Sequence, residues 1–193
     1  MKYRPPNAAV PSSIAPPNEA FELTLTGFPA RGSPGGRRGH LSVGWFRPLL
    51  MNVLRMEGIC TGFWAVRLLT AEAMAELHLR TMNIPAPTDV LTFDYSGGEG
   101  MDRHIELDTA VCLDVARREA VRRGHSVSHE LLLYMVHSLL HVRGYNDLTA
   151  HEARRMHRRE DEILTQMLTV PVYRARKGAG RRRNKVASGG RAG

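Results

Sequence analysis

Two histidines and one aspartate in the C-terminal half of the chain have a spacing that could bind a metal ion. His137 and His141 are four residues apart, and residues at this spacing lie on one face of an α-helix, about 5 to 6 Å from each other. Gly144 can end such a helix, so that the chain turns back and brings Asp147 to the same point. The pattern HxxxHxxGxxD therefore predicts three ligands and one open position, the arrangement of a catalytic rather than a structural zinc ion.

Other interpretations of these residues stay open on spacing alone. Two histidines on a buried helix are often core residues that hydrogen-bond to neighbouring groups. His151 and His157 are alternative third ligands, although both fall inside the next expected helix. The glycine and the acid at the turn favour the metal site formed by His137, His141 and Asp147.

The helix that carries the two histidines must hold them firmly. Residues 130–142 are apolar on nearly all sides, which predicts the most buried helix of the protein. Ser126 or Ser128 can cap its N-terminus. Thr149 and Glu152 have the spacing of a capping box, so a last helix is expected to begin there. Its buried face is expected to contain Ala153, Met156, Ile163 and Met167.

Strands and helices alternate along the rest of the chain. The predicted strands cover residues 21–25, 63–69, 90–95 and 105–113. The predicted helices cover residues 45–54, ending near Gly58, then 71–79 behind the cap Thr70, and a third that Asp114 caps and Gly124 ends. This alternation predicts an α/β fold with a small mixed, mostly parallel sheet packed with helices and the metal site on a buried central helix.

Composition divides the chain into three parts. Residues 1–40 contain seven of the eleven prolines and a Gly/Arg-rich stretch, so we expect a mobile N-terminal extension before a folded domain over 41–170. Residues 174–193 contain eight Lys and Arg and no acid, which equals the whole net charge of +8. The segment 171–193 is therefore expected to be a disordered basic tail, either binding a polyanion or simply solvated.

The remaining composition indicates a cytoplasmic protein. Cys60 and Cys112 are too few for a disulfide framework and lie in or beside apolar runs, so buried thiols in a reducing compartment are expected. The first residues lack the apolar stretch of a signal peptide, and no apolar run approaches the ~20 residues that span a membrane. No membrane partner is expected, and the sequence leaves the oligomeric state open.

Two further stretches, taken with the histidine motif, resemble a known family. Residues 87–93 read Pro-Thr-Asp-Val-Leu-Thr-Phe, and residues 105–120 run from a strand into a helix with Asp108, Cys112 and Glu119. In order and spacing, these segments and the motif from His137 to Asp147 resemble the YbeY family of endoribonucleases over residues 42–168.

The resemblance implies a zinc-dependent, single-strand-specific endoribonuclease with one Zn²⁺ per chain. It also implies ribosomal RNA and the small ribosomal subunit as partners, with work in 16S rRNA 3′-end maturation and in ribosome quality control. Four arginines of the helix after Asp114 could follow the RNA backbone, with a solvated helix face as the alternative. They are Arg117, Arg118, Arg122 and Arg123.

The chain departs from the family pattern at three positions. Asp147 stands where many members have histidine, and Ser138 stands where glycine is usual. Met82 occupies the position of the family arginine, whose role is either lost or taken over by Arg80, two residues away, which is the candidate catalytic contact to phosphate. These departures keep a second function open, a ribosome-assembly factor with a structural zinc. A zinc metallopeptidase is disfavoured because its motif needs glutamate at the position of Ser138.

Overall fold

The computed structural model describes residues 21–29, 41–97 and 103–168. Strands and helices alternate along these residues, as the hydrophobic pattern predicts. The strands are β1 (Phe21–Thr26), β2 (Thr61–Leu69), β3 (Val90–Asp94) and β4 (His104–Cys112). The helices are α1 (Val43–Met56), α2 (Ala71–Met82), α3 (Leu113–Arg123), α4 (Val127–Val142) and α5 (Ala150–Leu168).

The four strands form one sheet in the order β1-β2-β4-β3. β1 and β4 pair with β2 in parallel, whereas β3 pairs with β4 in the antiparallel direction. The connections between the parallel strands contain helices, as parallel pairing requires. The predicted fold class, a small mixed and mostly parallel sheet packed with helices, is therefore confirmed.

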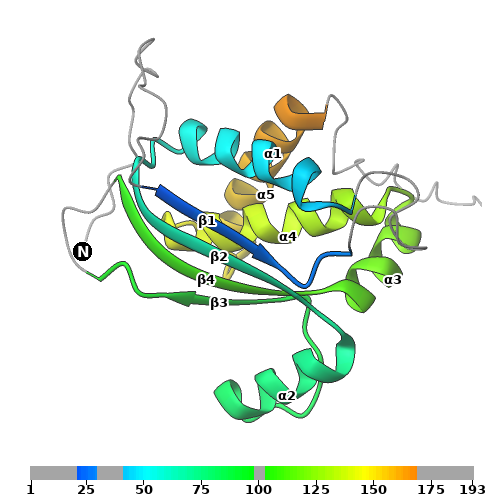
Figure 1. Ribbon diagram of the computed structural model, residues 1–193. Helices are drawn as coiled ribbons and strands as arrows, with labels where there is room; N and C mark the ends of the chain where they lie inside the picture. The colour runs from blue at the N-terminus through cyan, green and yellow to red at the C-terminus, as the bar shows by residue number, and fades with distance from the viewer. Residues whose placement is uncertain (1–20, 30–40, 98–102, 169–193) are drawn as a thin grey trace, which may run out of the picture.

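Helix α4 lies at the centre of the layered structure. In Figure 1, α1, α4 and α5 lie on one side of the sheet, with α4 next to the strands, and α2 lies on the other side. Every residue from Ser128 to Val136 is buried. A helix that is apolar on nearly all sides must be covered on nearly all sides. This explains why α4 contacts the sheet, α1, α3 and α5.

The helix caps confirm one prediction from the sequence and contradict another. Ser126 accepts a hydrogen bond from the backbone nitrogen of His129, so it is the cap of α4. The prediction that Asp114 caps α3 is wrong, because Cys112 occupies the N-cap position. The Asp114 carboxylate instead accepts a hydrogen bond from the backbone nitrogen of Ala71, 2.9 Å away, at the start of α2. It therefore links two helices that follow different strands.

The predicted division of the chain concerns residues that lie largely outside the described ones. Within 1–40, the structure describes residues 21–29, where β1 pairs with β2. The basic segment 171–193 lies outside the described residues, and so do residues 98–102. The boundaries at 41 and 170 stay predictions. Within the described ranges, no helix combines the length and the apolar character needed to cross a bilayer.

Candidate metal site

The structure brings the three predicted ligands together at the C-terminal end of α4. The candidate ligand atoms of His137, His141 and Asp147 all lie within 4.8 Å of one another. The Nε2 atoms of the two histidines are 3.0 Å apart, and Nε2 of His137 is 4.0 Å from Oδ2 of Asp147. The His137 side chain is 23% exposed and that of Asp147 is 44% exposed, so the group opens to solvent on the aspartate side.

Gly144 makes this convergence possible. Its φ of +82° lies in the left-handed region, which glycine adopts without steric cost. The backbone nitrogens of Gly144 and Tyr145 donate to the carbonyls of His141 and Leu140, which closes the last turn of α4. The chain then reverses and places Asp147 beside the two histidines.

The ring nitrogens that face away from the site are both held by acceptors. Nδ1 of His141 lies 3.1 Å from the carbonyl oxygen of Tyr145, which can only accept, so this nitrogen carries the proton. Nδ1 of His137 lies 2.7 Å from Oε1 of Glu160, a carboxylate with no solvent exposure. Such contacts fix the ring orientation and the tautomer of metal-binding histidines.

When both rings are neutral, these hydrogen bonds leave two nitrogen lone pairs facing each other at 3.0 Å. The two Nε2 atoms then repel each other, unless one of them takes up a proton and donates it to the other as a hydrogen bond, or a metal ion lies close to both. In a tetrahedral zinc site, bonds of about 2.0–2.1 Å place two ligand nitrogens roughly 3.3 Å apart. Two imidazole nitrogens and one carboxylate oxygen therefore fit a zinc-like ion and leave a fourth position free.

The surroundings of His137 shift its pKa in two directions. Burial lowers the pKa of this imidazole, but the hydrogen bond and charge of Glu160 raise it, with further help from Asp147 and Asp89, so that the net shift is upward. The same negative charges favour a metal cation. A proton and a metal ion therefore compete for Nε2 of His137, and acid favours the proton.

Sequence reasoning missed Glu160, although a signal for it was present. The predicted buried face of the last helix places residue 160 on the same side as Met156 and Ile163, and all three are buried. A carboxylate on a buried face needs a partner, and His137 is that partner. The rival ligands His151 and His157 lie in α5, and neither belongs to the metal-ligand group found among the described residues.

A chain of buried hydroxyls anchors α4 to the sheet beside the ligands. Ser138 accepts a hydrogen bond from Thr92 of β3 at 2.9 Å, and its oxygen lies 2.8 Å from that of Thr109 on β4. Thr109 in turn accepts from the indole nitrogen of Trp64 at 2.9 Å. Ser138 and Thr109 have no solvent exposure, so these bonds set how α4 is rotated on the sheet and which way His137 points.

The candidate arginines lie in two other places. Arg80 is in the last turn of α2, where its side chain is 66% exposed and pairs with Glu76 at 3.6 Å. Its predicted contact with phosphate stays a prediction. The four arginines of α3 all pair with acids, which supports the interpretation of a solvated helix face. Their partners are Asp114 for Arg117, Glu119 for Arg118 and Arg122, and Glu119 and Glu130 for Arg123.

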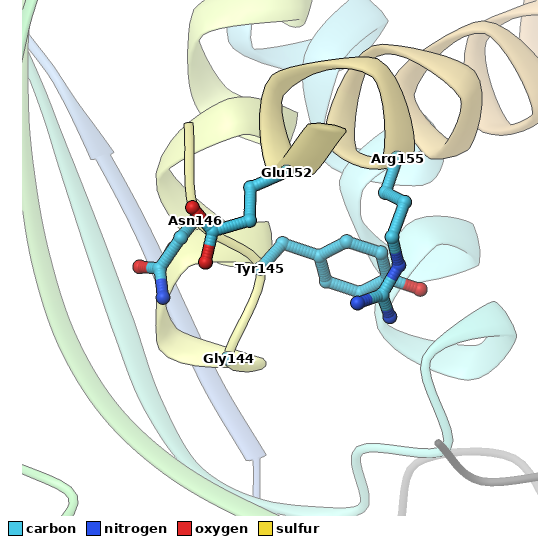
Figure 2. A pocket seen from close by; sticks show the side chains of 5 residues that line it. All are labelled: Gly144, Tyr145, Asn146, Glu152 and Arg155. Carbon is cyan, nitrogen blue, oxygen red and sulfur yellow. The ribbon is translucent and has the colours of Figure 1, made fainter. Parts of the chain in front are cut away.

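A pocket lies next to the loop that carries Asp147. It has a volume of about 170 Å³ and is lined by Gly144, Tyr145, Asn146, Glu152 and Arg155. Figure 2 shows Asn146 and Glu152 on one side of the pocket and the Tyr145 ring with the Arg155 guanidinium on the other. The pocket beside the candidate metal site is thus lined by an aromatic ring, an amide, a carboxylate and a guanidinium group.

The fold and this site define an α/β protein whose buried central helix presents a candidate set of two histidines and one aspartate to a metal ion. The family model for endoribonuclease YbeY matches residues 44–168. The chain belongs to the YbeY family.

Several curated relatives carry the same name. The endoribonuclease YbeY of Thermobifida fusca is 39% identical over 106 residues, which cover 52% of this chain and 68% of that protein. Those of Corynebacterium jeikeium and Mycolicibacterium smegmatis are each 34% identical, with 52% and 56% of this chain and 60% and 66% of the relative covered. The matched stretch thus spans roughly two thirds of these relatives.

A solved structure has a similar fold. The solution structure of TM1509 from Thermotoga maritima is similar with a TM-score of 0.50 and 21% sequence identity, covering 76% of this chain and 88% of that one. At this identity the likeness concerns the fold.

Replacing Glu160 by glutamine tests its influence on the ligand His137. The amide can still accept the hydrogen bond from Nδ1, but it removes a buried negative charge, so we expect zinc affinity to fall about 10- to 100-fold. Competition with a chromophoric chelator measures this. Glu162→Gln removes an exposed carboxylate from the same helix and should leave zinc affinity unchanged. Equal affinities of the two variants would contradict the assigned role.

Replacing Ser138 by alanine tests the hydroxyl chain. The buried Thr109 and its neighbour Thr92 would each lose a hydrogen-bond partner, so we expect the free energy of unfolding to fall by about 1–3 kcal/mol. Zinc affinity should fall as well, because α4 is no longer held in one rotation. Urea unfolding and chelator competition measure the two effects, with Ser128→Ala, another buried serine of α4, as the control. A loss of stability with unchanged zinc affinity would show that Ser138 does not position His137.

Proposed function

We propose that this chain is a zinc-dependent, single-strand-specific endoribonuclease that acts in ribosomal RNA processing. The observation that carries the proposal is the pair of Nε2 atoms 3.0 Å apart, with Asp147 beside them and an acceptor behind each histidine. Membership of a family whose curated relatives are named endoribonuclease YbeY supplies the reaction and the RNA substrate.

The three ligands would hold one Zn²⁺ per chain. When bound, zinc acts as a Lewis acid and lowers the pKa of a coordinated water toward neutrality. Glu160 and the Tyr145 carbonyl keep the two imidazoles in the tautomer that binds. Asp147 adds a negative charge to the ligand set, which makes the coordinated water less acidic than a third histidine would. Its exposed side chain leaves that side of the site accessible to a phosphodiester.

The finer assignments follow from the family resemblance. They are action in the cytoplasm, partnership with ribosomal RNA and the small ribosomal subunit, maturation of the 16S rRNA 3′ end and ribosome quality control. Arg80 is the proposed contact for phosphate charge, since position 82 holds methionine.

One observation favours the alternative of a ribosome-assembly factor with a structural zinc. Arg80 is exposed and paired with Glu76 on α2, and α2 lies on the opposite side of the sheet from α4 (Figure 1). A metallopeptidase is disfavoured, because the residue after His137 is Ser138, whose hydroxyl is buried against Thr92 and Thr109 and is no general base.

Replacing His141 by alanine tests the proposed activity. Purified wild-type protein should contain one zinc per chain by elemental analysis and should cut single-stranded RNA but not casein. His141→Ala removes a ligand, so we expect zinc content to be lost and RNA cleavage to fall at least about 100-fold. His157→Ala removes a histidine outside the ligand group and should keep both properties. Cleavage that His141→Ala retains would indicate a contaminating nuclease, and zinc without cleavage in the wild type would favour the assembly factor.

Replacing Arg80 by alanine tests the proposed phosphate contact. We expect RNA cleavage to fall about tenfold or more while zinc content stays at the wild-type value, because a charge that stabilises phosphate acts without binding the metal. Arg67→Ala, which removes another partly exposed and paired arginine, is the control. Full cleavage by the Arg80 variant would exclude Arg80 from the active site.

A further inference from the structure

The outer face of α5 carries a stripe of basic side chains. Positions i, i+3, i+4 and i+7 share one face of a helix, and in α5 these positions are the exposed residues His151, Arg154, Arg155 and Arg158. The buried residues of α5 lie on the opposite face of the helix; they are Met156, Glu160, Ile163 and Leu164. We call the four exposed residues the α5 basic face.

Two arginines of this face, Arg154 and Arg158, lack the acidic partners that the arginines of α3 have within the described residues. Arg154 and Arg158 form no ion pair within the described part of the chain, whereas each arginine of α3 has a carboxylate partner. Two nearby acids are engaged elsewhere. Glu152 bonds Thr149 in the capping box, and Glu162 pairs with Arg159.

This arrangement carries a cost for the isolated protein. Arg154 and Arg158 are four residues apart, where like charges repel on a helix surface. An anion along the face would relieve this repulsion.

The α5 basic face begins beside the candidate metal site. Arg155 also lines the pocket that Tyr145 and Asn146 form (Figure 2), and Asp147 is the next residue after Asn146. From His151 to Arg158 the face covers eight residues, and the seven steps between them are about 10 Å along the helix. A chain of phosphates running along it would therefore pass close to the loop that holds a metal ligand.

We propose that the α5 basic face binds the backbone of single-stranded RNA next to the cleaved position. This inference rests on the proposed function for the identity of the polyanion. An anionic membrane is the less suitable partner, because α5 has no exposed large apolar side chain among its described residues to insert into lipid.

The test compares two double variants of the full chain. Arg154→Gln/Arg158→Gln removes two charges from α5, and Arg117→Gln/Arg118→Gln removes two from α3. Both keep the basic segment 174–193, so its contribution is the same in each. Binding of a labelled single-stranded 2′-O-methyl oligouridine is measured by fluorescence anisotropy between about 50 and 200 mM salt, and gel electrophoresis verifies that the oligonucleotide stays intact.

Loss of two phosphate contacts predicts a specific salt dependence. The slope of log K against log salt should become shallower by about 1.4, since each contact to a single strand contributes about 0.7. At 0.1 M salt the same relation gives an affinity loss of about 25-fold for the α5 variant. The α3 variant should bind like the wild type, and thermal unfolding should show that all three proteins are folded.

Other results would overturn the inference. These are an unchanged slope for the α5 variant, equal losses in both variants, or no binding of the oligonucleotide by the wild type. The same three proteins are also titrated with phosphatidylglycerol vesicles, and a loss seen with the vesicles but not with the oligonucleotide would overturn the inference as well. The experiment does not depend on cleavage. If the wild type cuts RNA but the α5 variant binds the oligonucleotide as well as the wild type does, only this inference is refuted. If the α5 variant loses binding as predicted but the wild type does not cut RNA, only the proposed nuclease activity is refuted.

Discussion

The candidate site depends on two imidazole lone pairs that are held face to face. Each histidine gives its Nδ1 proton to an acceptor behind it, the buried carboxylate of Glu160 for His137 and the carbonyl of Tyr145 for His141. Neither ring can turn to separate the lone pairs without losing a hydrogen bond in a partly buried environment. A cation between the two Nε2 atoms removes the repulsion, either a proton that turns the contact into a hydrogen bond or a metal ion that binds both nitrogens.

The rest of the fold keeps this arrangement in place. The ligands stand at the end of a helix that is covered by the sheet on one side and by other helices elsewhere. Apolar packing alone tolerates small rotations of such a helix, whereas directed hydrogen bonds do not. The chain from Trp64 through Thr109 to Ser138 supplies these directed bonds one residue away from His137. Close packing and one polar anchor thus act together on the same ligand.

Helices α3 and α5 are both rich in arginine, but they differ in how far acidic side chains compensate the positive charges. Both α3 and α5 carry several arginines, but those of α3 have acidic partners within the same helix or on α4. Arg123 joins α3 to α4 through Glu130, the other pairs lie within α3, and the paired arginines contribute little net field. Arg154 and Arg158 on α5 have no acidic partner among the described residues, so their positive charges can interact with an external anion. A basic helix therefore indicates polyanion binding only when the structure leaves its charges uncompensated.

The sequence by itself determined the features that depend on neighbours along the chain. It predicted the helical spacing of the two histidines, the turn at Gly144, the capping box before α5 and the alternation of strands and helices, because backbone geometry and hydrophobic periodicity act over a few residues. The tertiary structure decided the contact between Glu160 and His137, the use of Asp114 at the start of α2, and the pairing of the α3 arginines. Each of these depends on the angle and register at which separate elements pack. The acceptor for His141 is a backbone carbonyl, which any residue at position 145 would supply, so only its place in the folded chain could reveal it.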